Sequence, residues 1–138
     1  MDFSSVNWIA VIVASLAAFV VNFAWFGPLK MYTRWMRALK REPATPDEMP
    51  PTPVLFGATF ASLLVEGTVI AALIAGLHDS AGASQGLATG LAVGIGLAAM
   101  PALGHRLFSA QGVKVWAIEV GADVIVAALM GLIIAAIG

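Results

Sequence analysis

The chain has 138 residues, of which 60% are hydrophobic and only 11% are charged. A soluble domain carries about 25% charged residues, so this composition excludes a soluble enzyme and a disordered tail and predicts a protein dissolved in lipid. The formal net charge of -1 offers no basic surface for a phosphate backbone, so we expect no nucleic acid partner. Cysteine is absent, which excludes disulfides and thiolate chemistry. At this length we expect one transmembrane domain over residues 1–138.

Long stretches without charge mark the expected membrane spans. Residues 6–26, 54–77, 86–108 and 115–137 each come close to the roughly 20 apolar residues that a helix needs to cross hydrocarbon. Because backbone in lipid must close its hydrogen bonds within each segment, helices suit these lengths. The sequence therefore predicts an all-α bundle of four transmembrane helices. No Lys or Arg precedes the first span, so we expect that span to remain on the mature protein.

A basic segment follows the first span. Gly27 and Pro28 favour a bend, and apolar side chains then recur at helical spacing among Lys and Arg over residues 29–41. This pattern predicts a short amphipathic helix in the headgroup region. Residues 43–53 are rich in proline and are expected to form a stiff, solvated linker that cannot sustain a helix.

The positions of the cations predict the orientation. Five Lys and Arg residues lie between the first two spans, and Arg106 and Lys114 flank the loop between the last two. Basic loops remain in the cytoplasm, so both termini are expected on the periplasmic or outer side. Trp8 near one face, and three tryptophans near the other, fit aromatic belts at the two interfaces: Trp25, Trp35 and Trp116.

Small residues predict where helices approach closely. Glycines repeat every fourth residue on the third span, and alanines do so on the first: Gly86, Gly90 and Gly94, and Ala10, Ala14 and Ala18. We favour packing within the chain, with a homodimer face as the alternative. Pro101 removes one helical hydrogen bond and is expected to bend the third span, either as a simple kink or as a gating hinge.

Acidic residues inside the spans are the candidates for function. Glu66 lies about 18 Å from the start of its span, close to the bilayer centre. Glu119 and Asp123 are four residues apart and share a face of the last span. The three carboxylates could form a stepped ladder toward mid-membrane. The polar residues expected near the level of Glu119 are Asn22, His105 and Arg106.

Two interpretations of these acids stay open. In the functional one, Glu66 and Asp123 are proton or cation sites, with Glu119 and His105 at the inner mouth of a pathway. In the structural one, Glu119 pairs with Arg106 across the last hairpin, while Glu66 and Asp123 are neutral acids hydrogen-bonded inside the bundle.

Enzymatic chemistry is not expected. The Glu-x-x-His spacing of di-iron bundles does not occur within the spans, and no Ser or Thr has a neighbouring base. His78 lies on the outer loop, far from His105, so the pair is badly placed to hold a haem. We therefore expect no catalytic residue, no metal and no cofactor.

Several segments carry a resemblance to a known family. They are NWIAVIVASLAAF at 7–19, WFGPL at 25–29 and WM at 35–36, with GADV at 121–124 and LMGLI at 129–133 in the last span. Together they resemble the bacterial membrane proteins of the domain of unknown function 1761 family. The resemblance implies a small four-helix protein, placed by its composition in the bacterial inner (plasma) membrane. It implies no activity, so no catalytic residue follows from it.

Two classes of function remain. As a transporter, an oligomer would move a proton, a cation or a small solute along the face that carries Glu66 and Asp123. As an accessory subunit, the chain would pack against a larger membrane complex and stabilise it. Helix faces rich in small residues favour self-association and partner packing equally.

Overall fold

The protein is all-α, and its computed structural model describes residues 3–79 and 81–138. The element order is α1 (Trp8–Phe26), α2 (Met31–Ala38), a 3₁₀ turn η1 (Pro46–Glu48), α3 (Thr52–Leu77), α4 (Ala83–Ala92), a π-helical segment η2 (Val93–Ala99), α5 (Met100–Phe108) and α6 (Gly112–Ile137). The segments α4, η2 and α5 form one rod over Ala83–Phe108. Four long helices are therefore apolar enough to cross a membrane, which confirms the predicted fold class.

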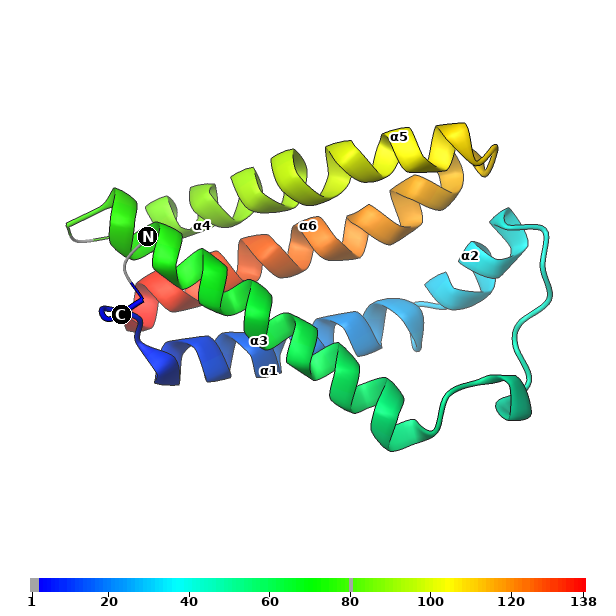
Figure 1. The fold of residues 1–138 in the computed structure, drawn as a ribbon, viewed down its shortest axis with the longest axis horizontal. Helices are drawn as coiled ribbons and strands as arrows, with labels where there is room; N and C mark the ends of the chain where they lie inside the picture. The colour runs from blue at the N-terminus through cyan, green and yellow to red at the C-terminus, as the bar shows by residue number, and fades with distance from the viewer. Residues whose placement is uncertain (1–2, 80) are drawn as a thin grey trace.

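The two ends of the molecule are easily told apart in Figure 1. The N- and C-termini lie together at one end, here called the terminal end, and α2 lies at the opposite end, here called the loop end. This arrangement follows from an even number of crossings. Helix α6 lies at the centre, because it contacts α1, α2, α3 and the whole rod formed by α4, η2 and α5.

Helix α2 is present but shorter than the expected 29–41. It ends because Lys40 adopts a left-handed φ of 57°, and the N–H groups of Lys40 and Arg41 donate to the carbonyls of Arg37 and Met36. This is a Schellman motif, which closes a helix end by satisfying its last carbonyls. Residues 43–53 were expected to form a linker without helix, and this was wrong in two details. Helix α3 already begins at Thr52. The linker also contains the single turn η1, where the Thr45 N–H donates to Glu48 Oε2 at 2.9 Å.

The third span packs against α6 through the predicted glycines. A Cβ added to Gly86 would lie 2.2 Å from the Gly131 carbonyl oxygen, and one added to Gly90 would lie 2.1 Å from the Ala127 oxygen. A Cβ on Gly94 would meet the Val124 Cα at 2.9 Å. Only a missing side chain permits this approach. The glycine face is thus used inside the chain and is not available to a second copy.

The region before Pro101 is π-helical, a form that the sequence analysis did not anticipate. Met100 N–H reaches back to the Ile95 carbonyl, so the helix is widened one turn before the proline. Proline has no N–H and its ring crowds the preceding turn, and widening the backbone is one way to relieve that crowding. The π-helical segment thus covers the seven residues Val93–Ala99, just before Met100 and Pro101.

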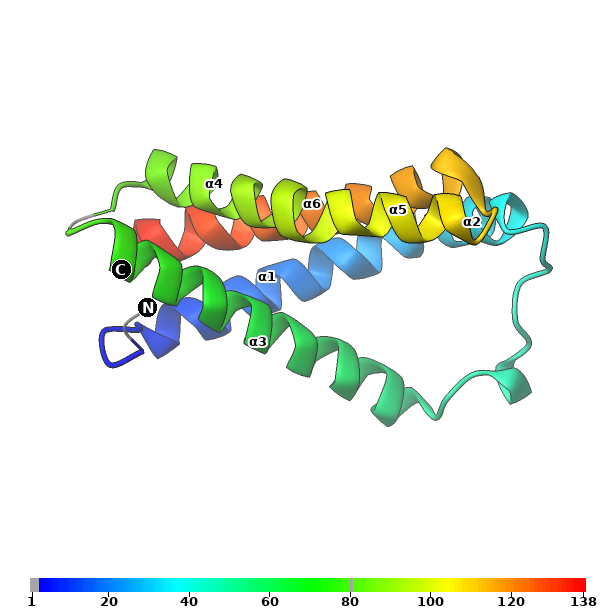
Figure 2. The same cartoon turned by 45° about the horizontal axis from the view of Figure 1, so that its top comes forward.

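Helix α3 is packed along only part of its length. Its buried residues begin at Leu63 and continue to Ile74, whereas none of residues 52–62 is buried. Figure 2 shows this first part of α3 diverging from the other helices toward the loop end. Edge-to-face contacts of Phe19 with Phe56 and Phe60 link it to α1. The tight core therefore occupies the terminal half.

Candidate functional site

The ion pair expected between α5 and α6 is present. Arg106 Nε donates to Glu119 Oε2 and Arg106 Nη2 donates to Glu119 Oε1, both at 2.7 Å. Arg106 Nη1 also donates to Gln111 Oε1. A third helix joins the pair, because Trp35 Nε1 on α2 donates to Glu119 Oε1 at 2.8 Å. Glu119 thus accepts from two helices besides its own, and it is committed to structure rather than free to bind a ligand.

The chain between α5 and α6 explains this geometry. Ala110 adopts a left-handed φ of 57°, and Ala110 and Gln111 donate their N–H groups to the carbonyls of Leu107 and Arg106. This second Schellman motif turns the chain tightly and aligns α5 beside α6. Arg106 and Glu119 then face each other across the hairpin.

The tryptophans at the loop end bind the protein itself. Trp25 Nε1 donates to the Ile118 carbonyl at 3.0 Å, and Trp116 Nε1 donates to the Ala99 carbonyl at 2.7 Å. Together with Trp35, each indole links two helices. Their positions in the sequence predicted an interfacial belt and gave no indication of these partners. A buried indole N–H needs a hydrogen-bond acceptor, and this requirement could have indicated that each tryptophan bonds to a neighbouring helix.

Glu66 and Asp123 differ sharply from Glu119. Glu66 is half-buried and Asp123 is exposed, although both lie well inside helices that could span a membrane. By helical rise, Glu66 is about 21 Å from the start of α3 and Asp123 about 16 Å from the start of α6. Within residues 3–79 and 81–138, neither carboxyl group forms a hydrogen bond or an ion pair. The expectation that both would be hydrogen-bonded inside the bundle is therefore wrong for this chain on its own.

The exposure of Asp123 follows from the path of α3. Gly67 lies against Met130, because a Cβ added there would be 2.7 Å from Met130 Cε. Asp123 precedes Met130 by about two helical turns, so it shares the face of α6 that looks toward α3. At that level α3 has already diverged (Figure 2), and the carboxylate is uncovered.

The three carboxylates follow one another, with Asp123 between Glu119 and Glu66, and do not form a cluster. Asp123 is close enough to interact electrostatically with Glu119 on its own helix and with Glu66 on α3. Among the residues that the structure describes, no three His, Asp or Glu side chains are grouped so that they could hold one metal ion. The stepped ladder expected from the sequence stays a prediction.

A polar stripe on α3 leads toward Glu66, and sequence reasoning missed it. Thr59 and Ser62 lie on the same side of the helix as Glu66, at roughly heptad spacing. Both hydroxyls donate to carbonyls of their own helix, Thr59 to Leu55 at 2.8 Å and Ser62 to Thr59 at 2.7 Å. The stripe lies in the unpacked part of α3. The helical spacing of these polar residues was visible in the sequence, but the exposure of the stripe depends on where α3 leaves the bundle.

Two residues expected near Glu119 are not bonded to it. His105 is exposed, and Asn22 is half-buried on α1. In the part of the chain that the structure describes, neither side chain forms a hydrogen bond or an ion pair. Of the three expected neighbours, Arg106 alone is joined to Glu119.

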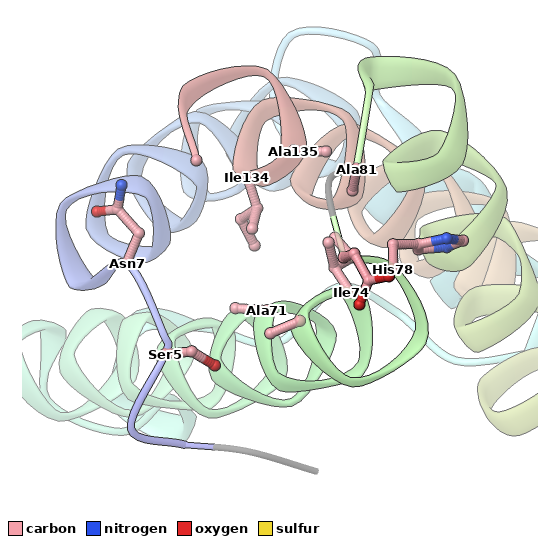
Figure 3. A pocket seen from close by; sticks show the side chains of 11 residues that line it. Ser5, Asn7, Ala71, Ile74, His78, Ala81, Ile134 and Ala135 are labelled. Atoms are coloured by element: carbon pink, nitrogen blue, oxygen red, sulfur yellow. The ribbon is translucent and has the colours of Figure 1, made fainter.

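Two cavities lie at opposite ends of the molecule. A cavity of about 240 Å³ at the terminal end is lined by Ile74, His78 and Ile134, with Asn7 and Ser5 at its margin (Figure 3). The Asn7 carboxamide oxygen caps α1, accepting from the N–H groups of Ile9 and Ala10. The second cavity, of about 490 Å³, lies between α2 and α6. Neither contains Glu66, Glu119 or Asp123.

Comparison with protein families identifies the chain at the level of a family. The model for the family described as "Protein of unknown function (DUF1761)" matches residues 9–135. The chain belongs to the DUF1761 family. This match confirms the resemblance and covers all four candidate spans almost completely. No curated protein and no solved structure matches the chain. The DUF1761 assignment brings no activity, so the function has to be argued from the site.

Proposed function

We propose that this protein carries out proton- or cation-linked transport as an oligomer in the bacterial inner membrane, with Glu66 and Asp123 as the binding groups. One observation carries the proposal. Two carboxylates without hydrogen-bonding or ionic partners among the described residues lie deep in apolar helices, and one of them is exposed. An acid at mid-bilayer costs roughly 2.5 to 3.5 kcal/mol unless protons, cations, water or a partner compensate it.

The surroundings of Glu66 support access from one end. Toward the loop end, the residues before Leu63 are unburied and carry the hydroxyls of Thr59 and Ser62. Toward the terminal end, Ile70 and Met130 are both 0% exposed and fill the space between α3 and α6. Water and ions would therefore reach Glu66 from the loop end, and this packed layer would close the other side.

An oligomer is proposed because the exposed carboxylate of Asp123 has to be shielded from lipid. Charged side chains in membrane spans face a bundle interior or a water-filled cavity, whereas Asp123 is exposed on this chain. A second copy placed against the diverging half of α3 would enclose both acids. The glycine face of the third span cannot form the contact between two copies, because α6 already packs against it. In this proposal the chain catalyses no covalent reaction, and the basic loops face the cytoplasm with both termini outside.

Flux measurements test the proposal. The unmutated protein is reconstituted in liposomes that contain a pH-sensitive dye. It is expected to dissipate a proton gradient across the liposome membrane, either with no other cation present or in exchange for sodium or potassium. Glu66→Gln should abolish this flux and Asp123→Asn should reduce it, because each removes a titratable group while preserving shape. Glu48→Gln, which changes an exposed acid outside the spans, is the matched control and should leave flux intact. Equal flux in Glu66→Gln and unmutated protein, or no flux in either, would count against transport.

The accessory-subunit alternative rests on the same exposed Asp123, which a cationic residue of another membrane protein could cover. Purification in mild detergent separates the two. A self-contained oligomer by light scattering supports transport, whereas a stable complex with one defined larger protein supports the subunit role.

A further inference from the structure

The cavity between α2 and α6 collects positive charge at the loop end. Its lining includes Arg34 and Arg37 from α2 and Lys114 from the first turn of α6. All three side chains are exposed. In residues 3–79 and 81–138 none of the three forms an ion pair, and Glu119, five residues after Lys114 on α6, is already bound by Arg106 and Trp35.

The remaining walls of this cavity are apolar. They are formed by Trp25, Met31, Ala117 and Ile118. Trp25 is held in place, because its indole N–H donates to the Ile118 carbonyl and its ring lies 3.0 Å from the position of a Cβ on Gly121. The wall is therefore prearranged before any ligand arrives, which lowers the ordering cost of binding.

The position of the cavity sets the kind of ligand. Trp25 lies in the last turn of α1 and Lys114 in the first turn of α6, so the cavity lies where two candidate spans leave the hydrocarbon. Cationic groups on one side and apolar groups on the other match a molecule with an anionic head and a hydrophobic body. Arg binds phosphate oxygens through its planar fork, and Lys adds a point charge. A volume of about 490 Å³ is large enough for a phosphate, its glycerol and the first carbons of a chain.

We propose that this cavity is a binding site for the phosphate headgroup of an anionic glycerophospholipid. Arg34, Arg37 and Lys114 would hold the phosphate, and Trp25 with Met31 would lie against the glycerol and upper acyl chain. Basic patches beside membrane helices attract anionic lipid with roughly 1 kcal/mol per cation near the surface. Here the three cations come from two separate elements and converge on one cavity, which predicts a discrete site rather than a diffuse charge effect.

The test compares two triple variants with equal loss of charge. The first is Arg34→Gln/Arg37→Gln/Lys114→Gln, which empties the cavity of cations. The second is Lys30→Gln/Lys40→Gln/Arg41→Gln, which removes three exposed cations of the same loop end that do not line the cavity. Circular dichroism and gel filtration of each full-length variant confirm that it is folded.

The readout is the number and affinity of phosphatidylglycerol molecules bound, measured by native mass spectrometry with phosphatidylcholine as the zwitterionic reference. The unmutated protein and the second variant should retain one phosphatidylglycerol preferentially. The first variant should bind it about 10-fold or more weakly. An equal loss in both triple variants would overturn the site, because it would show only general attraction. Soluble glycerol 3-phosphate binding as tightly as the lipid would overturn the lipid assignment, since the apolar wall would then contribute nothing.

Discussion

The terminal and loop ends of this molecule are stabilised in different ways. At the terminal end, small residues let backbones touch: Ala10, Ala14 and Ala18 are 0% exposed, and glycines of α4 lie against α6. At the loop end, helices are tied by polar contacts through Glu119 and the indole N–H groups of tryptophans. At the terminal end Ile70 and Met130 are fully buried between α3 and α6, whereas at the loop end the first part of α3 is unburied and three cations line an open cavity. The candidate lipid cavity accordingly lies at the loop end, and Glu66 and Asp123 lie near the middle of their helices, where the two halves meet.

The largest expected effect comes from filling the close contact at the terminal end. Gly90→Ala should lower the free energy of unfolding by about 1–3 kcal/mol, because its Cβ would lie 2.1 Å from a backbone oxygen of α6. Gly104→Ala is the matched control, since a Cβ there meets nothing within 4 Å. It should be neutral or stabilising by up to about 1 kcal/mol. Reversible unfolding in mixed micelles measures both, and equal stability of the two variants would remove the basis for a tight terminal half.

The second-largest expected difference between the two halves is in their access to water. The chain has no cysteine, so single cysteines report cleanly on their position. Ser62→Cys, on the exposed stripe of α3, should react with a membrane-impermeant maleimide roughly tenfold or more faster than Ser15→Cys. Ser15 is 0% exposed and its hydroxyl donates to the Leu63 carbonyl at 3.3 Å. Similar rates in liposomes would show that α3 does not open toward the loop end.

Loss of one polar link should have a moderate effect. Trp35→Phe removes the N–H that binds Glu119 and keeps the ring, so we expect a loss of about 1–2 kcal/mol in unfolding free energy. Trp8→Phe is the control, because Trp8 is 56% exposed at the other end. If the two variants are equally stable, the polar links do not hold the loop end together.

The smallest effect is expected in the linker. The Thr45 N–H, together with the Thr45 hydroxyl, holds the pKa of the Glu48 carboxyl below its usual range. A lowered folded-state pKa stabilises the turn above the unfolded pKa of Glu48, and the effect is lost as the pH falls through the folded value. Thr45→Pro removes both the N–H and the hydroxyl, at a φ of -73° that proline tolerates. NMR titration should then show a higher Glu48 pKa, and an unchanged value would mean that the hydrogen bond is not the cause.

Much of the site could be anticipated from local pattern. The pair of Glu119 and Arg106 followed from two opposite charges near a hairpin, and it is present. The joining of Trp35 to that pair could not be anticipated, because it depends on how α2 folds back against α6. His105 was expected near the level of Glu119 because it lies close to a helix end, yet depth does not fix the direction of a side chain: successive residues on a helix point about 100° apart, and His105 is exposed.

Composition and spacing by themselves determined the number of spans, the short basic helix and the glycine face, because lipid enforces apolar length and close helices enforce small residues. Tertiary structure alone decided which acids are bound and which are open. Whether a carboxylate is covered depends on the direction in which a neighbouring helix leaves it. The divergence of α3 over the residues that precede its packed segment, a property of the whole bundle, is what leaves Asp123 exposed.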